Sequence, residues 1–187
     1  SVTLDDLSTA LEAAITEKRL RGFTAITHST GGPLLRHWLK RRAAAPRLLK
    51  RLIMLAPANH GSALAQLGKG RLARMKAFLD GVEPGQKILD WLELGSEEQW
   101  ALNREWMDYE AVEQGIFPFV LSGDSVDPKL YDHLNSYTGE AGGDGVVRLA
   151  AANLNYEYVQ LAQVANGRLE PVAWHRSPRT AFRVVPG

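Results

Sequence analysis

The sequence predicts an α/β protein with a mainly parallel sheet flanked by helices and a helical cap inserted between two strands. Helical and strand-like patterns alternate over the first 56 residues, which is typical of parallel sheets with covering helices. Within this stretch, a short buried strand runs into a turn that holds a serine and two glycines. A long helix-favouring stretch follows. The 187 residues are enough for one domain with a sizeable core.

The first four elements follow from apolar spacing and from breakers. Residues 4–19 place leucines and an isoleucine at helical spacing, with two aspartates in the first turn. Residues 23–27 form a short apolar strand, and 31–45 resume a helical pattern that Pro46 breaks. Residues 52–56 predict the second strand.

Residues 61–114 are rich in leucine, alanine, glutamate and glutamine, and they predict helices. More than fifty residues is long for a simple crossover, so we expect a helical cap over a site, with a crossover helix pair as the alternative. A third strand is predicted at 116–121, a hairpin at 156–163 and 169–174, and a last strand at 181–185.

Composition excludes several classes of function. Hydrophobic residues make up 45% and charged residues 23%, as in ordinary globular domains. The net charge of +1, from 22 basic and 21 acidic residues, argues against a nucleic-acid partner. No apolar stretch approaches the length of a membrane span. The chain has no cysteine, which excludes thiol chemistry and slightly favours a cytoplasmic location.

The segment 24–32 has the layout of a nucleophile elbow, the sharp turn between a strand and a helix that exposes a serine. Ser29 stands at the turn, with Gly31 and Gly32 just beyond it. Thr27 occupies the first glycine position of the G-x-S-x-G pattern, which is therefore met in part. The alternative interpretation is a plain helix start with Ser29 as its N-cap.

An elbow would give Ser29 two advantages. The turn would expose its hydroxyl, which still needs an adjacent base to become a good nucleophile. The backbone N–H of Thr30, at the positive end of the following helix, would stabilise an oxyanion. The two glycines would let the turn pack closely against neighbouring backbone.

A second motif follows at Asn59-His60-Gly61-Ser62, after the second predicted strand. With the His-Ser-x-Gly-Gly elbow at similar separation, the chain resembles bacterial triacylglycerol lipases and related α/β-hydrolases. The resemblance implies an α/β-hydrolase-like fold. In that fold the catalytic histidine follows the acid along the chain, so we expect His60 to be a structural or site-lining residue.

A third motif, Gly142-Gly143-Asp144-Gly145-Val146-Val147, matches the turn that carries the catalytic acid in the same lipases. The resemblance implies that Asp144 orients the catalytic base. Asp124 is the rival acid, because it directly follows a predicted strand. The cluster of Asp124, Asp127, Asp132 and His133 fits no calcium-loop template, and we expect a solvated polar loop rather than a metal site.

The catalytic base is left open among three alternatives. His175 is the one histidine after Asp144 in the sequence. The resemblance places the base in a loop beyond the final strand, which here means just past Gly187. The third alternative is that no functioning base exists.

The resemblance covers the central and late parts of such a domain. Only 28 residues precede Ser29, so the first strands and the loop that gives the second oxyanion donor are missing. This implies a fragment or a shortened relative, whose partner would be the remainder of its parent polypeptide.

The sequence therefore predicts a serine hydrolase that cleaves carboxylic esters of small molecules or lipids through an acyl-enzyme, with no cofactor and no metal. Two alternatives remain. One is a non-catalytic hydrolase scaffold that acts as an interaction module, and the other is a serine acyltransferase that uses an alcohol in place of water.

Overall fold

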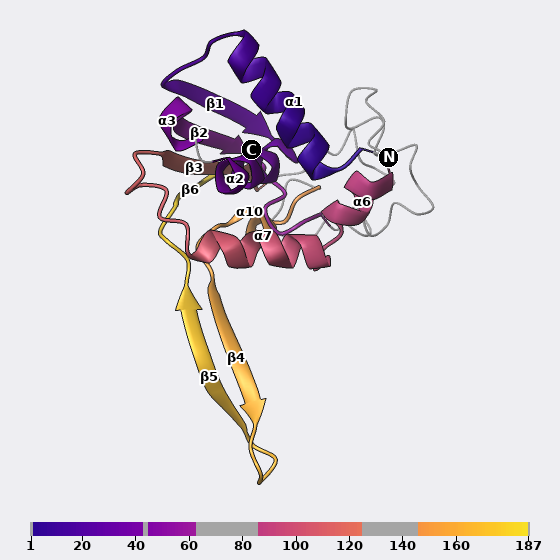
Figure 1. Cartoon of the computed structure of the whole chain (residues 1–187). Helices are drawn as coiled ribbons and strands as arrows, with labels where there is room; N and C mark the ends of the chain where they lie inside the picture. Colours follow the sequence, from indigo (N-terminus) through magenta and orange to yellow (C-terminus); the bar gives the residue numbers. More distant parts are fainter. Residues whose placement is uncertain (1, 43–44, 63–85, 125–145, 187) are drawn as a thin grey trace.

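The fold is built on a four-stranded parallel sheet, seen in a computed structural model that describes residues 2–42, 45–62, 86–124 and 146–186 (Figure 1). The strand order is β1-β2-β3-β6, and each neighbouring pair is parallel. The strands are β1 (Phe23–His28), β2 (Leu49–Leu55), β3 (Phe117–Gly123) and β6 (Ala181–Val185). The predicted α/β class with a mainly parallel sheet is confirmed.

The two faces of this sheet have different environments. On one face, Leu52, Met54 and Val120 are fully buried in the core. The other face carries large apolar side chains that stay accessible, because their strand positions alternate with the buried ones. This exposed sheet face comprises Ile26, Leu55, Phe117, Phe119 and Val185.

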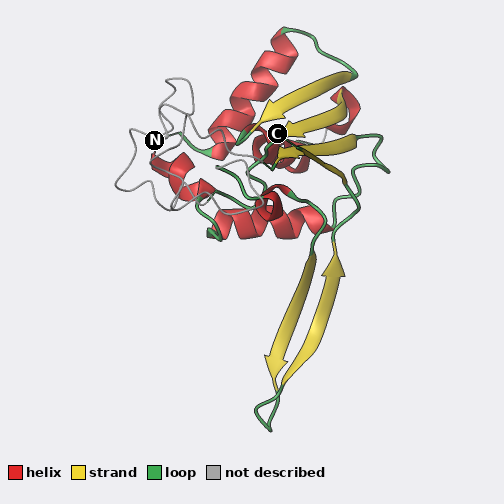
Figure 2. Cartoon of the chain, turned by 180° about the vertical axis from the view of Figure 1, so that it is seen from behind, coloured by secondary structure: helices red, strands yellow, loops and turns green. Residues whose placement is uncertain are grey.

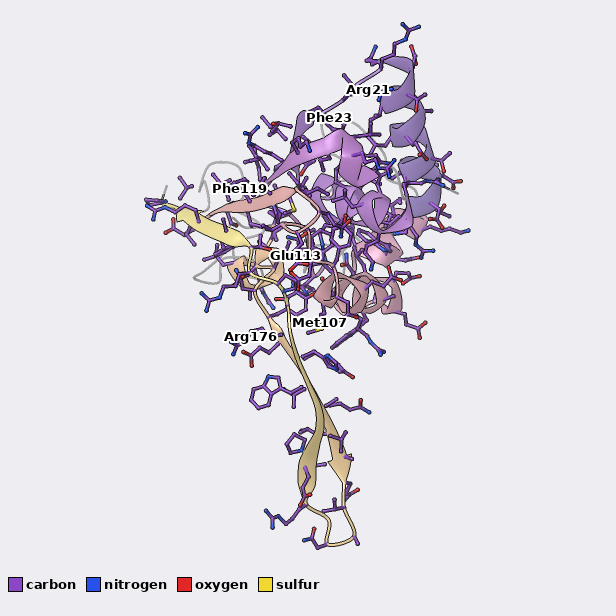
Figure 3. The ribbon with its side chains drawn as sticks, turned by 60° about the vertical axis from the view of Figure 1, so that its left-hand side comes forward. Arg21, Phe23, Met107, Glu113, Phe119 and Arg176 are labelled. Atoms are coloured by element: carbon purple, nitrogen blue, oxygen red, sulfur yellow. The ribbon has the colours of Figure 1, made fainter. Side chains whose placement is uncertain are left out.

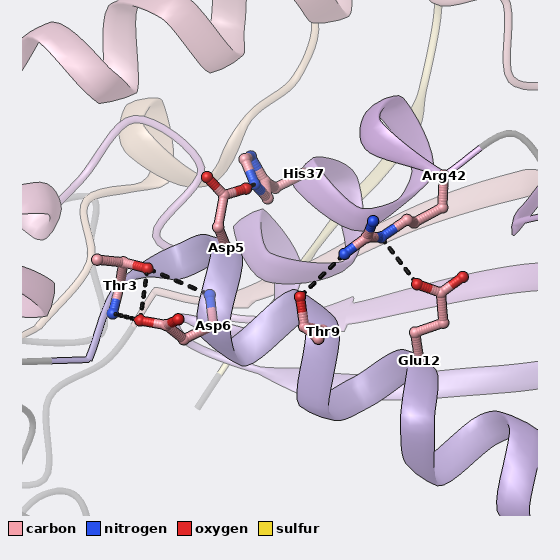
Figure 4. Close-up of polar contacts among 7 residues, drawn as sticks. All are labelled: Thr3, Asp5, Asp6, Thr9, Glu12, His37 and Arg42. Carbon is pink, nitrogen blue, oxygen red and sulfur yellow. Dashed lines mark hydrogen bonds and ion pairs between the residues drawn. The ribbon is translucent and has the colours of Figure 1, made fainter.

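Helices α1 (Leu4–Glu17) and α2 (Gly31–Arg41) form the layer over the buried face. Helix α2 packs on β1 and β2, and α1 packs on α2. Figure 4 shows the polar contacts that fix α1, beginning with a capping box between Thr3 and Asp6. His37 Nε2 lies 2.7 Å from Asp5 Oδ1, and Arg42 pairs with Glu12 at 2.8 Å, so polar contacts join the two helices.

The predicted helical stretch contains α6 (Gln86–Leu92) and α7 (Glu97–Met107). Ser96 caps α7 by accepting a hydrogen bond from the Gln99 N–H. Residues 63–85 lie outside the described residues, and the cap function of 61–114 stays a prediction. No described helix has the length and apolar character needed to cross a bilayer.

The predicted hairpin is present as β4 (Glu157–Gln163) and β5 (Leu169–Arg176), an antiparallel pair. It follows the short helix α10 (Leu149–Ala152) and extends far from the rest of the molecule (Figures 1 and 2). Its turn closes with a hydrogen bond from the Val164 N–H to the Arg168 carbonyl, and Gly167 there has a φ of +79°.

The largest differences from the predicted element boundaries are at the end of α2 and at the start of β2. Helix α2 ends at Arg41, and Pro46 lies in a separate short helix, α3 (Ala45–Leu48), where the first turn tolerates a missing N–H. Strand β2 begins at Leu49 rather than at residue 52. The exposed Lys50 and Arg51 interrupt the apolar pattern, although both belong to the strand.

Candidate active site

The predicted elbow has the backbone geometry of a strand–turn–helix junction. Ser29 directly follows β1 and has a φ of +51°, in the left-handed region that non-glycine residues seldom adopt. Its N–H donates to the Leu55 carbonyl at 3.0 Å, which continues the sheet pairing to the end of β2. Helix α2 begins two residues later. The strained conformation is therefore held between a strand pair and a helix start.

Close packing leaves little room for a side chain at either glycine after Ser29, and least at Gly32. A Cβ on Gly32 would lie 2.7 Å from Pro57 Cβ and 3.2 Å from Met54 Sδ. A Cβ on Gly31 would lie 3.0 Å from Thr27 Cβ. The space left by Gly31 accommodates Thr27, which explains how a threonine fits where the G-x-S-x-G pattern has glycine.

Ser29 is more covered than the elbow pattern predicts, since 8% of the residue is exposed. The chain after β2 lies against it, and the Ala58 N–H donates to the Ser29 carbonyl at 3.3 Å. Among the described residues, the Thr30 N–H has no hydrogen-bond acceptor. That donor is therefore available for the oxyanion function, which stays a prediction.

The segment after β2 connects the elbow to a distant part of the chain. Asn59 is fully buried, and its Nδ2 donates to the Ala152 carbonyl at 2.8 Å. Ser62 Oγ donates to the Val146 carbonyl at 2.8 Å, and the His60 N–H donates to the Ala151 carbonyl at 2.9 Å. Residues 146–152 are thus fixed beside the loop that packs on the elbow.

A buried arginine organises the contacts behind this loop. Arg36 on α2 is fully buried and donates through Nη1 to the Asn59 backbone and side-chain oxygens, both at 3.2 Å. Its Nη2 donates to Asn103 Oδ1 at 2.8 Å, and Asn103 Nδ2 donates to the Asn59 carbonyl at 3.0 Å. The Trp106 ring lies against the guanidinium, 4.8 Å from its centroid to Cζ.

Among the described residues, no carboxylate forms an ion pair with Arg36, and burial lowers its pKa to about 10. The cation is therefore held by neutral oxygens and an aromatic face. Arg36 belongs to none of the motifs that the sequence contains. Helical spacing could have indicated its burial, because Arg36 stands four positions after Gly32 on the face of α2 that packs inward.

His60 occupies a packed position beside this network. Its Nε2 lies 3.0 Å from the Asn153 carbonyl, so that nitrogen donates, and its ring meets the Tyr156 ring edge-on at 4.8 Å. Burial lowers the pKa of His60 to about 4, and the positive charge of Arg36 adds to the effect. A neutral, hydrogen-bonded imidazole fits the expected structural or site-lining function.

His60 also lines a cavity of about 440 Å³ beneath α7. The walls are largely aromatic or apolar, and the lining residues include Trp100, Asn103, Met107, Tyr156 and Tyr158. Ser29 and Thr30 are not among its lining residues. The cavity therefore lies behind the elbow loop rather than at the serine.

The other predicted site residues are placed as follows. Asp144 lies outside the described residues, as do Asp127, Asp132 and His133. Asp124 is exposed and follows the carboxyl end of β3. His175 is exposed on β5 of the projecting hairpin, with its ring 6.3 Å from that of Tyr158. In the described part of the chain, no hydrogen bond joins Ser29 to a histidine.

The parallel sheet, the elbow and the covering helices define a partial α/β-hydrolase fold of the lipase and esterase type. Over its whole length the chain is similar to phospholipase PlaB from Legionella pneumophila, with 47% identity and a TM-score of 0.88. The same phospholipase in complex with thio-NAD gives 45% identity and a TM-score of 0.85. The chain spans 41% and 40% of these two phospholipase chains.

Lipase BlEst2 from Bacillus licheniformis, in its mature form, is similar over 79% of this chain and 59% of its own. Its identity of 20% and TM-score of 0.60 support the fold alone. No protein-family model and no curated protein sequence matches the chain.

Replacement of Gly32 by alanine tests the packing at the elbow. We expect Gly32→Ala to lower the free energy of unfolding by roughly 1–3 kcal/mol, because the added methyl group meets the rigid Pro57 ring. Urea unfolding followed by circular dichroism measures the change. Gly31→Ala is the matched control and should cost less. A larger loss in Gly31→Ala than in Gly32→Ala would contradict the packing argument.

The lowered pKa of His60 predicts a pH-dependent stability. An unfolded histidine binds a proton near pH 6.5, whereas folded His60 does so near pH 4. Between these values the unfolded state holds more protons, so stability falls as the pH decreases, by about 3 kcal/mol at pH 4. Denaturant unfolding at a series of pH values should show this slope. It should flatten in His60→Gln and persist in His175→Gln, and an unchanged slope in His60→Gln would refute the assignment.

Proposed function

We propose that the chain carries the nucleophile of a lipolytic serine hydrolase that cleaves carboxylic esters. The observation that carries this proposal is Ser29, held at a positive φ between β1 and α2, in a fold similar to lipases and a phospholipase. The similarity supports a lipolytic hydrolase, and the elbow gives it a candidate nucleophile.

The reaction would proceed through an acyl-enzyme. Ser29 Oγ attacks the ester carbonyl while a histidine takes its proton, and the Thr30 N–H donates to the oxyanion that forms. Collapse expels the alcohol, which receives that proton from the histidine. Water, deprotonated by the same histidine, then attacks the acyl group and releases the carboxylic acid and free Ser29.

Asp144 is our candidate for the acid that orients this histidine. The supporting observation is that Val146, two positions later in the chain, accepts a hydrogen bond from Ser62 in the segment that packs on the elbow. Asp124 is the alternative, because the carboxyl ends of β1 and β3 share one edge of the sheet.

The catalytic base stays a prediction, and it has two candidate positions. The strand β6 lies beside β3 and runs parallel to it, so a histidine that follows β6 would reach the same edge as Ser29. His175 is the alternative within the chain, and its place on the projecting hairpin makes it the weaker candidate.

The proposed substrate class rests on the similarity to a phospholipase, which points to a lipid ester. The stretch 61–114 would cap the site and select the acyl chain. Ester hydrolysis by a serine needs no cofactor. The phospholipase complex with thio-NAD makes a nicotinamide dinucleotide a second small molecule to test for binding.

Two alternative functions make different predictions. A serine acyltransferase would form the same acyl-enzyme and pass the acyl group to an added alcohol, which product analysis detects. A non-catalytic scaffold would form no acyl-enzyme at all.

Covalent labelling with a fluorophosphonate tests the nucleophile directly. We expect one adduct, on Ser29, located by mass spectrometry of peptides, and no adduct in Ser29→Ala. Ser122→Ala removes another buried serine at the end of a strand and should label normally. A full-length polypeptide that is folded yet unlabelled would favour the non-catalytic scaffold.

Paired substitutions distinguish the two candidate acids. Asp144→Asn should lower kcat for a phospholipid or a short-chain ester by roughly three to four orders of magnitude, because the histidine loses the partner that fixes its tautomer. Asp124→Asn should change kcat less than about tenfold. The opposite ranking would assign the acid to Asp124.

A further inference from the structure

The cavity beneath α7 takes no part in the steps of the proposed hydrolysis, because neither Ser29 nor Thr30 lines it. It lies between one side of α7 and the first residues of the β4–β5 hairpin. Figure 3 labels Met107 at the end of α7 and Arg176 at the base of the hairpin, at the level where the hairpin leaves the body. The cavity volume of about 440 Å³ is in the usual range for small-molecule pockets, roughly 300–1,000 Å³.

The walls of this cavity are mainly apolar, and its opening lies beside exposed residues of α7. At the opening, Trp100 is 55% exposed, and Arg104, one helical turn further along α7, is exposed as well. Deeper in, Met107 is buried, and the half-buried rings of Tyr156 and Tyr158 form the wall on the hairpin side. Such a space fits a flexible apolar chain, because hydrocarbon that is buried there leaves water without needing a hydrogen-bond partner.

Arg104 places a positive charge at the opening of the cavity. Its guanidinium Cζ lies 5.8 Å from the centroid of the Tyr158 ring, within the range of a cation–π contact. Among the described residues, Arg104 has no carboxylate partner. A contact with a ring face leaves the guanidinium N–H groups without an oxygen acceptor from that part of the chain. These donors are therefore available to an anionic group at the opening.

The other charges around the cavity also favour an anionic ligand over a cationic one. The positive charge of the buried Arg36 reaches the cavity, because it helps to lower the pKa of His60, which lines it. Glu157 is the carboxylate among the described lining residues. Its oxygens accept hydrogen bonds from Arg176 Nε at 2.8 Å and from Trp174 Nε1 at 3.0 Å, which compensate its charge. The local field at the cavity is therefore positive.

We propose that this cavity binds a long-chain fatty acid, with the carboxylate at Arg104 and the alkyl chain between Trp100, Tyr156 and Met107. A guanidinium can donate two parallel hydrogen bonds to a carboxylate, which fixes the head of the ligand. The chain gains affinity with each methylene that leaves water. Hydrolysis of a lipid ester releases such an acid, so the source of the ligand rests on the proposed function, whereas its binding needs no reaction at Ser29.

Quenching of tryptophan fluorescence by a brominated fatty acid tests where the ligand lies, because bromine on the chain quenches an indole at contact. We expect the full polypeptide to show saturable quenching by 11-bromoundecanoate. Trp100→Phe should remove most of this quenching, since Trp100 lines the cavity. Trp174→Phe is the matched control, because Trp174 is another exposed indole that does not line the cavity, and it should keep the quenching.

Titration calorimetry below the critical micelle concentration tests recognition of the carboxylate and of the chain. Arg104→Gln should raise the dissociation constant of dodecanoate at least about fivefold and leave that of dodecanol within about twofold. Arg21→Gln removes an exposed arginine outside the cavity and should change neither constant more than about twofold. Dodecanoate should bind roughly tenfold more tightly than decanoate, because two further methylenes are buried. Circular dichroism confirms that the variants are folded.

Three results would overturn the proposal. The first is equal affinity for dodecanoate in the unmodified protein and in Arg104→Gln. The second is quenching that is unchanged in Trp100→Phe. The third is Arg104-dependent binding of thio-NAD without any binding of dodecanoate, which would assign the cavity to a dinucleotide. A polypeptide that binds dodecanoate through Arg104 but takes no fluorophosphonate at Ser29 would support this site and refute the proposed function.

Discussion

The fully buried guanidinium of Arg36 is the contact on which the arrangement of the candidate site depends. It joins helix α2, the loop after β2 and helix α7 through Asn59 and Asn103. A buried cation without a carboxylate among the described residues is stable only where other groups replace the hydration that it loses, and the Asn59 and Asn103 oxygens and the Trp106 ring do so here. The same loop packs on Gly32 and donates to the Ser29 carbonyl. The position of the elbow and the burial of Arg36 are therefore two results of one packing arrangement.

Local patterns predicted the elements whose apolar residues are continuous or evenly spaced. The strand that begins at Phe23 and the hairpin were both predicted in this way. The start of β2 was not, because Lys50 and Arg51 stand in the strand with their side chains in water, and the pairing with β3 that holds them there is a long-range contact. Arg36 was missed for a related reason, since its partners are 23 and 67 positions away.

In the candidate site, the residues alone leave the catalytic acid open, and the resemblance to lipases favours one of the candidates. Thr27 departs from the elbow pattern, and its side chain fits because Gly31, which packs against it, has no Cβ. Four aspartates lie between β3 and β6 in the sequence, and the sequence position alone does not decide between the two candidate acids, Asp124 and Asp144. The lipase motif favours Asp144. The order of acid and base along the chain assigned His60 to a structural or site-lining function, and its hydrogen bond to the Asn153 carbonyl and low pKa fit that assignment.

The exposed sheet face has a practical consequence for any assay of lipolysis. Ile26, Phe117 and Phe119 expose apolar side chains to water, and exposed apolar surface of this kind binds detergent and lipid. Mixed micelles, the usual way to present a water-insoluble ester, would adsorb there as well as at the proposed nucleophile, Ser29. Apparent turnover would then vary with micelle concentration independently of chemistry. A soluble short-chain ester, measured below its critical micelle concentration, separates the two effects.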